Sequence, residues 1–182
     1  GHGQLLAGNR VEYTTFDGTK QELVAKHVVL ASGSVPMELK SVPFDGKAVV
    51  DSWGALEFDA VPKRLGVIGA GPIGCELAQS FARFGSQVNL IEAQHGIMSN
   101  EDRDAAQIVE QRMMKEGVHL LCCGKNLKVS KVDGGKRLTV DSHGQQYDVT
   151  VDEILVGVGR IPNVEGLGLE AIGVEFDRNG VK

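Results

Sequence analysis

Alternating and continuous apolar positions predict the order of strands and helices along the chain. Residues 10–15 and 21–31 alternate polar and apolar positions and are rich in Val, Thr and Tyr, and the turn sequence FDGTK separates them. This pattern predicts a β-hairpin. A loop region marked by Pro36 and Pro43 follows, and residues 51–60 connect it to the central segment.

The pattern changes to strand, helix and strand at residue 65. Residues 65–69 form a short continuous apolar run that ends in glycine, which is typical of a strand buried on both faces. The apolar positions that follow are three or four apart and predict one face of a helix: Ile73, Leu77, Phe81 and Phe84. Gly85 is placed to end this helix, and residues 87–92 form the next strand.

A second helix and a third strand complete this alternation. Residues 100–117 predict a helix with Asn100 as its cap, acidic residues in its first turn, and Lys115 and Gly117 at its end. Residues 118–123 predict a short strand.

Three alternating strands joined by glycine turns then predict a β-meander, at residues 127–132, 136–142 and 145–151. Residues 153–159 return to a continuous apolar run, as in a parallel strand, and one helical turn is expected within 167–172. Together these patterns predict an α/β fold. It would be a Rossmann-like domain with a three-layer parallel sheet and a β-meander.

Composition narrows the possible partners. The net charge of −5 argues against a nucleic-acid partner, and no apolar run reaches the roughly 18 residues of a membrane span. The 3 cysteines include no CxxC pair, which suits a reducing compartment and predicts a cytoplasmic location. Because the chain begins with glycine in sequence typical of a domain interior, we expect a piece of a longer protein.

The glycine-rich stretch after residue 68 predicts a dinucleotide site. Strand, GxGxxG, helix, strand and a terminal acid follow one another, as a dinucleotide-binding βαβ unit requires. Gly69 would make the tight turn, Gly71 would admit the pyrophosphate to the helix N-terminus, and Gly74 would let helix and strand pack closely. Glu92 would accept hydrogen bonds from ribose hydroxyls. Its charge would repel a 2′-phosphate, so NAD(H) is expected rather than NADP(H).

The order of motifs resembles a known family. The stretches VLASGSVP, DSWGALEFDAVPKRL, GAGPIGCELAQSFARFGSQVNLIE and EILVGVGRIPN are similar to those of flavin-dependent pyridine nucleotide–disulfide oxidoreductases, of the dihydrolipoamide dehydrogenase and mercuric reductase-like type. The resemblance implies that residues 1–50 and 156–182 belong to an FAD domain and residues 51–155 to an NAD domain. It also implies NAD and FAD as cofactors, the rest of a flavoprotein chain as partner, and a homodimer.

The resemblance assigns site residues position by position. Those matching NAD contacts are Gly69, Ala70, Gly71, Pro72, Ile73, Gly74, Glu76, Glu92, Leu127 or its neighbour Asn126, and Gly159. Those matching FAD contacts are Gly3, Ser32, Gly33 and Ser34, with serine at position 32 where threonine is usual.

Three of the matched or neighbouring residues have open or altered roles. Glu76, expected to be buried on the first turn of the helix, would lie near the nicotinamide, or it is a surface acid. Pro72 stands where some relatives carry a tyrosine gate and cannot replace it. Arg160 either lies near the seam between the two nucleotide sites or is a plain surface arginine.

Several family motifs are absent from this sequence. It contains neither the CxxxxC redox disulfide nor the first GxGxxG for FAD, so we expect no catalytic residue here and no activity of this chain alone. Cys122 and Cys123 would end a strand with side chains on opposite faces, as ordinary strand cysteines. The 5 histidines are scattered, so no metal site is expected.

Three functions remain open from the sequence. The first is the NAD(H)-binding part of a flavoprotein disulfide oxidoreductase, in which hydride passes between NAD(H) and FAD. The second is part of an FAD-dependent NADH oxidase or transhydrogenase without a disulfide. The third is a non-enzymatic nucleotide-binding module.

Overall fold

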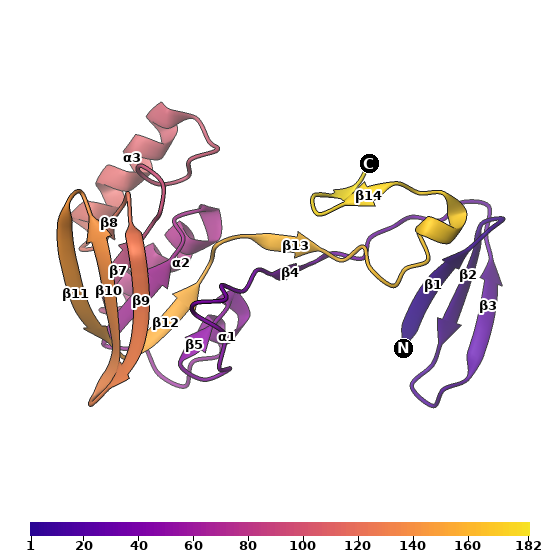
Figure 1. The fold of residues 1–182 in the computed structure, drawn as a ribbon, viewed down its shortest axis with the longest axis horizontal. Coiled ribbons are helices and arrows are strands. Elements are labelled where there is room, and N and C mark those ends of the chain that lie inside the picture. The colour runs from indigo at the N-terminus through magenta and orange to yellow at the C-terminus, as the bar shows by residue number, and fades with distance from the viewer. The chain divides into compact units, whose positions relative to one another are not determined.

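The computed structural model describes residues 1–182 and divides into two units (Figure 1). We call residues 36–159 the central unit, and residues 1–35 with 160–182 the flanking unit. The NAD domain predicted from the sequence, residues 51–155, falls within this central unit. No helix in the structure is long and apolar enough to cross a membrane.

A five-stranded parallel sheet forms the middle of the central unit. Its strands, in spatial order, are β5 (Val49–Val50), β12 (Glu153–Val156), β6 (Arg64–Ile68), β7 (Gln87–Ile91) and β8 (His119–Leu121). All four neighbouring pairs run parallel. The order reverses direction at β6, because the chain continues from β6 to β7 and β8 on one side and returns to β12 on the other. The predicted α/β fold with a parallel sheet is confirmed.

Strand β6 is buried on both faces, as its continuous apolar run predicted. Leu65 and Val67 pack into a cluster with helix residues such as Ala78 and Met113. Ile68 packs into a second cluster, with meander residues such as Leu138. The unit therefore has three layers, with helices on one face of the sheet and the meander on the other.

The meander consists of β9 (Lys125–Val132), β10 (Gly135–Ser142) and β11 (Gln145–Val151), all antiparallel. It approaches the sheet closely at Gly66, where an added Cβ would lie 2.5 Å from a methyl carbon of Leu138. The predicted meander is confirmed.

Two predictions about the helices need correction. Helix α2 (Pro72–Arg83) buries Gly74, Cys75, Ala78 and Phe81, whereas Phe84 lies beyond the helix and is exposed. The apolar spacing identified the helix and its core residues Leu77 and Phe81, but it missed the small residues that fill most of the contact. Helix α3 (Arg103–Lys115) is capped by Asp102, whose carboxylate accepts two backbone N–H bonds, and not by Asn100. The short α1 (Ser52–Leu56) was not predicted.

The flanking unit contains an antiparallel sheet of β1 (His2–Leu6), β2 (Arg10–Thr14) and β3 (Lys20–Val24). The predicted hairpin is present, but its second strand ends at residue 24 and not 31. Strand β4 (Ser34–Pro36) pairs with β13 (Arg160–Pro162). The expected helical turn is the 3-10 helix η1 (Glu170–Ile172), and β14 (Phe176–Asp177) pairs with β15 (Gly180–Val181).

Candidate nucleotide site

Two of the three motif glycines are required by backbone geometry. Gly69 follows β6 with a φ of +100°, and an added Cβ would lie 2.5 Å from the carbonyl oxygen of Gly157, which follows β12. At Gly74 an added Cβ would lie 1.9 Å from the carbonyl oxygen of Gly69. Any side chain at either position would force the backbone apart. These glycines therefore bring β6, β12 and α2 together at the point where the strand order reverses.

Gly71 differs from both. It is the N-cap of α2, its φ of −71° suits any residue, and nothing lies within 4 Å of an added Cβ. No side chain caps the helix, and Pro72 occupies its first turn. The first N–H groups of a helix have no acceptor within the helix and attract anions. Neither backbone nor packing requires glycine here, so the position offers open space in front of an uncapped helix N-terminus.

The Glu92 carboxylate ties the glycine loop to the end of β7. One of its oxygens accepts the N–H of Ala70 at 2.7 Å, and the other accepts the N–H of Gln94 at 2.7 Å. The carbonyl of Ala70 in turn accepts the N–H of Met98 at 2.8 Å. The structure thus bonds Glu92, which was predicted to accept ribose hydroxyls, to the glycine loop itself. It adds a role in loop geometry that sequence spacing could not reveal.

The other residues of the central unit that were predicted to contact NAD lie in different surroundings. Glu76 is exposed in this chain, so the expectation of a buried acid is wrong, because its side chain projects from the face of α2 opposite Ala78. Leu127 packs against the cluster between sheet and meander, and with Asn126 it lines a hollow of about 320 Å³. Gly159 has a φ of +133°, and its carbonyl accepts the N–H of Met37 at 2.9 Å.

In the flanking unit, the residues matched to FAD contacts form a hydrogen-bonded group. The Ser32 hydroxyl donates to the carbonyl of Asn163 at 2.6 Å, and the Asn163 amide donates back to the Ser32 carbonyl at 2.9 Å. Arg160 donates to the Ser34 hydroxyl at 2.7 Å. Gly33 has a φ of +72° with open space around it. Gly3 lies apart, within β1. The sequence did not identify Asn163, because its partner Ser32 lies 131 positions away along the chain.

The cysteines differ most from expectation. Cys122 and Cys123 both follow the end of β8, and their sulfur atoms lie within 4.8 Å of each other, so their predicted placement on opposite strand faces is wrong. Cys123 has a φ of +56°, which breaks the alternation of a strand. Burial raises the pKa of Cys123, and the neighbouring Cys122 raises it further. Burial also raises the pKa of the Cys75 thiol to about 12.

Comparison with known proteins identifies the family. The model of the pyridine nucleotide-disulphide oxidoreductases matches residues 2–182. The chain therefore belongs to this family.

Similar proteins are dihydrolipoyl dehydrogenases. The enzyme of Thermus scotoductus is 40% identical, over 97% of this chain and 41% of the relative. The enzyme of Bacillus subtilis is 37% identical, over 86% of this chain and 34% of the relative. Among solved structures, LpdA of Mycobacterium tuberculosis has a TM-score of 0.84 at 29% identity, covering 98% of this chain and 39% of that one. The HOCl-induced flavoprotein disulfide reductase RclA of Escherichia coli has a TM-score of 0.77 at 26% identity, covering 100% and 40%. The chain spans 34–41% of the length of these proteins.

Proposed function

We propose that this chain is the NAD(H)-binding part of a flavoprotein disulfide oxidoreductase of the dihydrolipoamide dehydrogenase type. In the full-length protein, hydride would pass between NAD(H) and FAD. The family match and the named relatives support this reading over an oxidase or transhydrogenase without a disulfide. This chain would bind the nucleotide and orient it, and the disulfide chemistry would require residues outside it.

The observation that carries the proposal is the space at Gly71. The other motif glycines are explained by packing, whereas Gly71 is open, has an ordinary φ and precedes an uncapped helix. Such a position is what a pyrophosphate needs, because free N–H groups and the helix dipole favour the anion and a missing side chain admits it. The residues therefore fit an NAD(H) site at the reversal point of the sheet.

Each residue near this site would have a separate task. The N–H groups at the start of α2 would bind the pyrophosphate. Each oxygen of the Glu92 carboxylate accepts one backbone N–H bond and keeps a further lone pair. With these lone pairs Glu92 would accept hydrogen bonds from ribose hydroxyls. Its charge would disfavour a 2′-phosphate and thereby select NAD(H) over NADP(H). Pro72, Ile73, Glu76, Leu127 and Gly159 would complete the contacts. When bound, the nicotinamide supplies hydride chemistry.

The fit to FAD is partial within this chain. Gly33 offers open backbone, but the hydroxyls of Ser32 and Ser34 already bond to Asn163 and Arg160. We therefore propose that FAD binds only in the full-length protein, with Gly3, Ser32, Gly33 and Ser34 among its contacts. Purified chain should carry no stoichiometric flavin absorbance, and its presence would contradict this part of the proposal.

The family resemblance also suggests a homodimeric, cytoplasmic whole protein. Light scattering of the full-length protein would test the dimer, and fractionation of source cells would test the location.

The central test is the substitution Gly71→Val. A branched side chain would occupy the pyrophosphate space, so NADH affinity should fall at least about 100-fold, while the thermal midpoint should change little because φ is ordinary and the space is open. Calorimetric titration with NADH and thermal unfolding of the same samples measure both quantities. Unchanged NADH affinity would overturn the proposal.

Gly3→Val is the matched control. It makes the same chemical change at an open glycine of the flanking unit. It should leave NADH affinity as it is. Gly71→Ala provides a graded step, with a smaller loss of affinity than Gly71→Val.

A further inference from the structure

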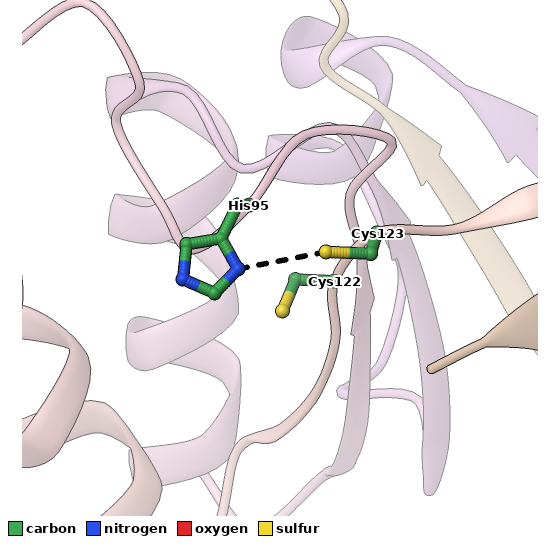
Figure 2. A group of neighbouring side chains, drawn as sticks. All are labelled: His95, Cys122 and Cys123. Carbon is green, nitrogen blue, oxygen red and sulfur yellow. Dashed lines mark hydrogen bonds between the residues drawn. The ribbon is translucent and has the colours of Figure 1, made fainter. Parts of the chain in front are cut away.

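Four thiol and imidazole side chains from three separate loops gather beyond the carboxyl ends of β7 and β8. His95 lies in the loop after β7, Cys122 and Cys123 lie directly after β8, and His143 lies in the turn between β10 and β11. Parallel neighbours end at the same edge of a sheet, which brings the first two loops together. Figure 2 shows His95 and both cysteine side chains converging.

The ligand atoms have the spacing of a metal site. The two sulfur atoms and a His95 ring nitrogen all lie within 4.8 Å of one another. The Cys123 sulfur is 3.5 Å from Nδ1 of His95, the contact dashed in Figure 2, and the Cys122 sulfur is 3.3 Å from Nε2 of His143. In a tetrahedral zinc site, bonds of about 2.3 Å to sulfur and about 2.0 Å to nitrogen place such atoms about 3.6 Å apart.

The backbone holds these donors in place. Cys123 has a φ of +56°, its N–H donates to the Gln94 carbonyl at 2.8 Å, and this links the cysteine loop to the loop of His95. The Cys122 carbonyl accepts the Ser142 hydroxyl at 2.6 Å, which links the pair to the turn of His143. His143 is the first residue of the two-residue turn between β10 and β11, so its φ of +50° is ordinary hairpin geometry. The positive φ of Cys123 is of the kind that clusters at functional sites in non-glycine residues.

We propose that His95, Cys122 and Cys123 form a zinc-binding site, with His143, which contacts the Cys122 sulfur, as the donor for the fourth position. Two thiolates and an imidazole suit Zn²⁺, whereas Mg²⁺ and Ca²⁺ prefer oxygen ligands. Each thiol releases its proton to solvent when it binds the ion. Both cysteines are half-buried and both histidines are exposed, so an ion can enter from solvent. None of these residues belongs to the proposed nucleotide site, so either proposal can fail alone.

The test is a Co²⁺ titration of the full 182-residue chain, reduced and stripped of metal. A thiol count in denaturant should first give three free cysteines. One equivalent of Co²⁺ should then produce a thiolate-to-metal charge-transfer band, and Zn²⁺ should abolish it. With three thiols counted, the absence of this band would overturn the proposal.

Variants assign the ligands. Cys122→Ser and Cys123→Ser should each weaken binding at least about 100-fold, and His95→Ala should do the same. His143→Ala should weaken it about 10- to 100-fold. Cys75→Ala and His119→Ala are the controls, because they remove a thiol and an imidazole outside the cluster. They should leave the Co²⁺ affinity unchanged. A charge-transfer band that survives in the combined Cys122→Ser and Cys123→Ser variant would also overturn the proposal.

Discussion

The central and flanking units differ in how completely they bury their apolar side chains. The central unit fills both faces of its parallel sheet, with Leu65 and Leu138 fully buried in two separate clusters. The core of the flanking unit has three buried residues, Leu5, Val164 and Leu169. Its Phe16 is 100% exposed. Since apolar burial is the main favourable term in folding, the central unit has the core of an independent domain and the flanking unit does not.

This difference indicates how the two units relate to the proposed function. The proposed dinucleotide site lies in the central unit, whose sheet is packed on both faces. The flanking unit holds the residues proposed to contact FAD, on a much smaller core. Five substitutions test this difference between the two units, and they are given in order of decreasing expected effect.

Gly74→Ala should have the largest effect, because the new Cβ would lie 1.9 Å from the Gly69 carbonyl oxygen and backbone cannot move aside cheaply. We expect a loss of at least about 3 kcal/mol in the free energy of unfolding. Urea denaturation followed by circular dichroism measures it. Gly71→Ala is the control and should cost less than about 1 kcal/mol. Equal costs at the two positions would contradict the distinction between packing and open glycines.

Leu138→Ala and Leu5→Ala should separate the two units. Both remove a buried leucine, with an expected cost of about 2–5 kcal/mol for Leu138. Leu5→Ala should reduce amide protection in the flanking unit while the central unit keeps its own. Hydrogen exchange with mass spectrometry reports both units at once. If Leu5→Ala lowered protection throughout the central unit, the two would unfold together and the comparison would fail.

Glu92→Ala should alter the site without unfolding the central unit. It removes the proposed ribose acceptor and two hydrogen bonds from backbone N–H groups, so we expect NADH affinity to fall by about 10- to 100-fold. Affinity for NADPH should stay level or rise, because the charge that repels a 2′-phosphate is gone. Calorimetry with both nucleotides checks this, and Glu92→Gln is the isosteric control. Equal losses for both nucleotides would assign Glu92 to loop structure alone.

Glu116→Gln should give the smallest effect, visible mainly in its pH dependence. The Arg83 guanidinium donates to Glu116 at 2.8 Å and, with Arg112 and Gln79, lowers the pKa of this carboxyl from 4.5 to about 2. A carboxyl whose pKa is lower in the folded state stabilises the fold at pH values above its unfolded pKa of 4.5. This stabilisation is lost as the pH falls from about 4.5 to about 2. The thermal midpoints of the parent and of Glu116→Gln should therefore converge as the pH falls through that range. A constant difference would contradict this.

Much of the fold could be predicted from the sequence. The apolar run ending in Gly69, the helix after it and the meander were all identified by local pattern, since period and turn residues act within a few positions. The family resemblance rested on the same local motifs. Candidate site residues such as Gly71 and Glu92 were also identified, because strand, turn and helix fix where they fall along the chain.

Tertiary structure decided what lies beside these elements. It placed the buried face of α2 on Cys75 and Ala78 and left Glu76 exposed. It also bonded Glu92, which was expected only to meet a ribose, to the glycine loop. It also brought His95 to a cysteine 28 positions away in the sequence. Local pattern cannot encode such contacts, because they depend on which strands become neighbours. Here the parallel pairing of β7 with β8 ended two distant segments at one edge of the sheet.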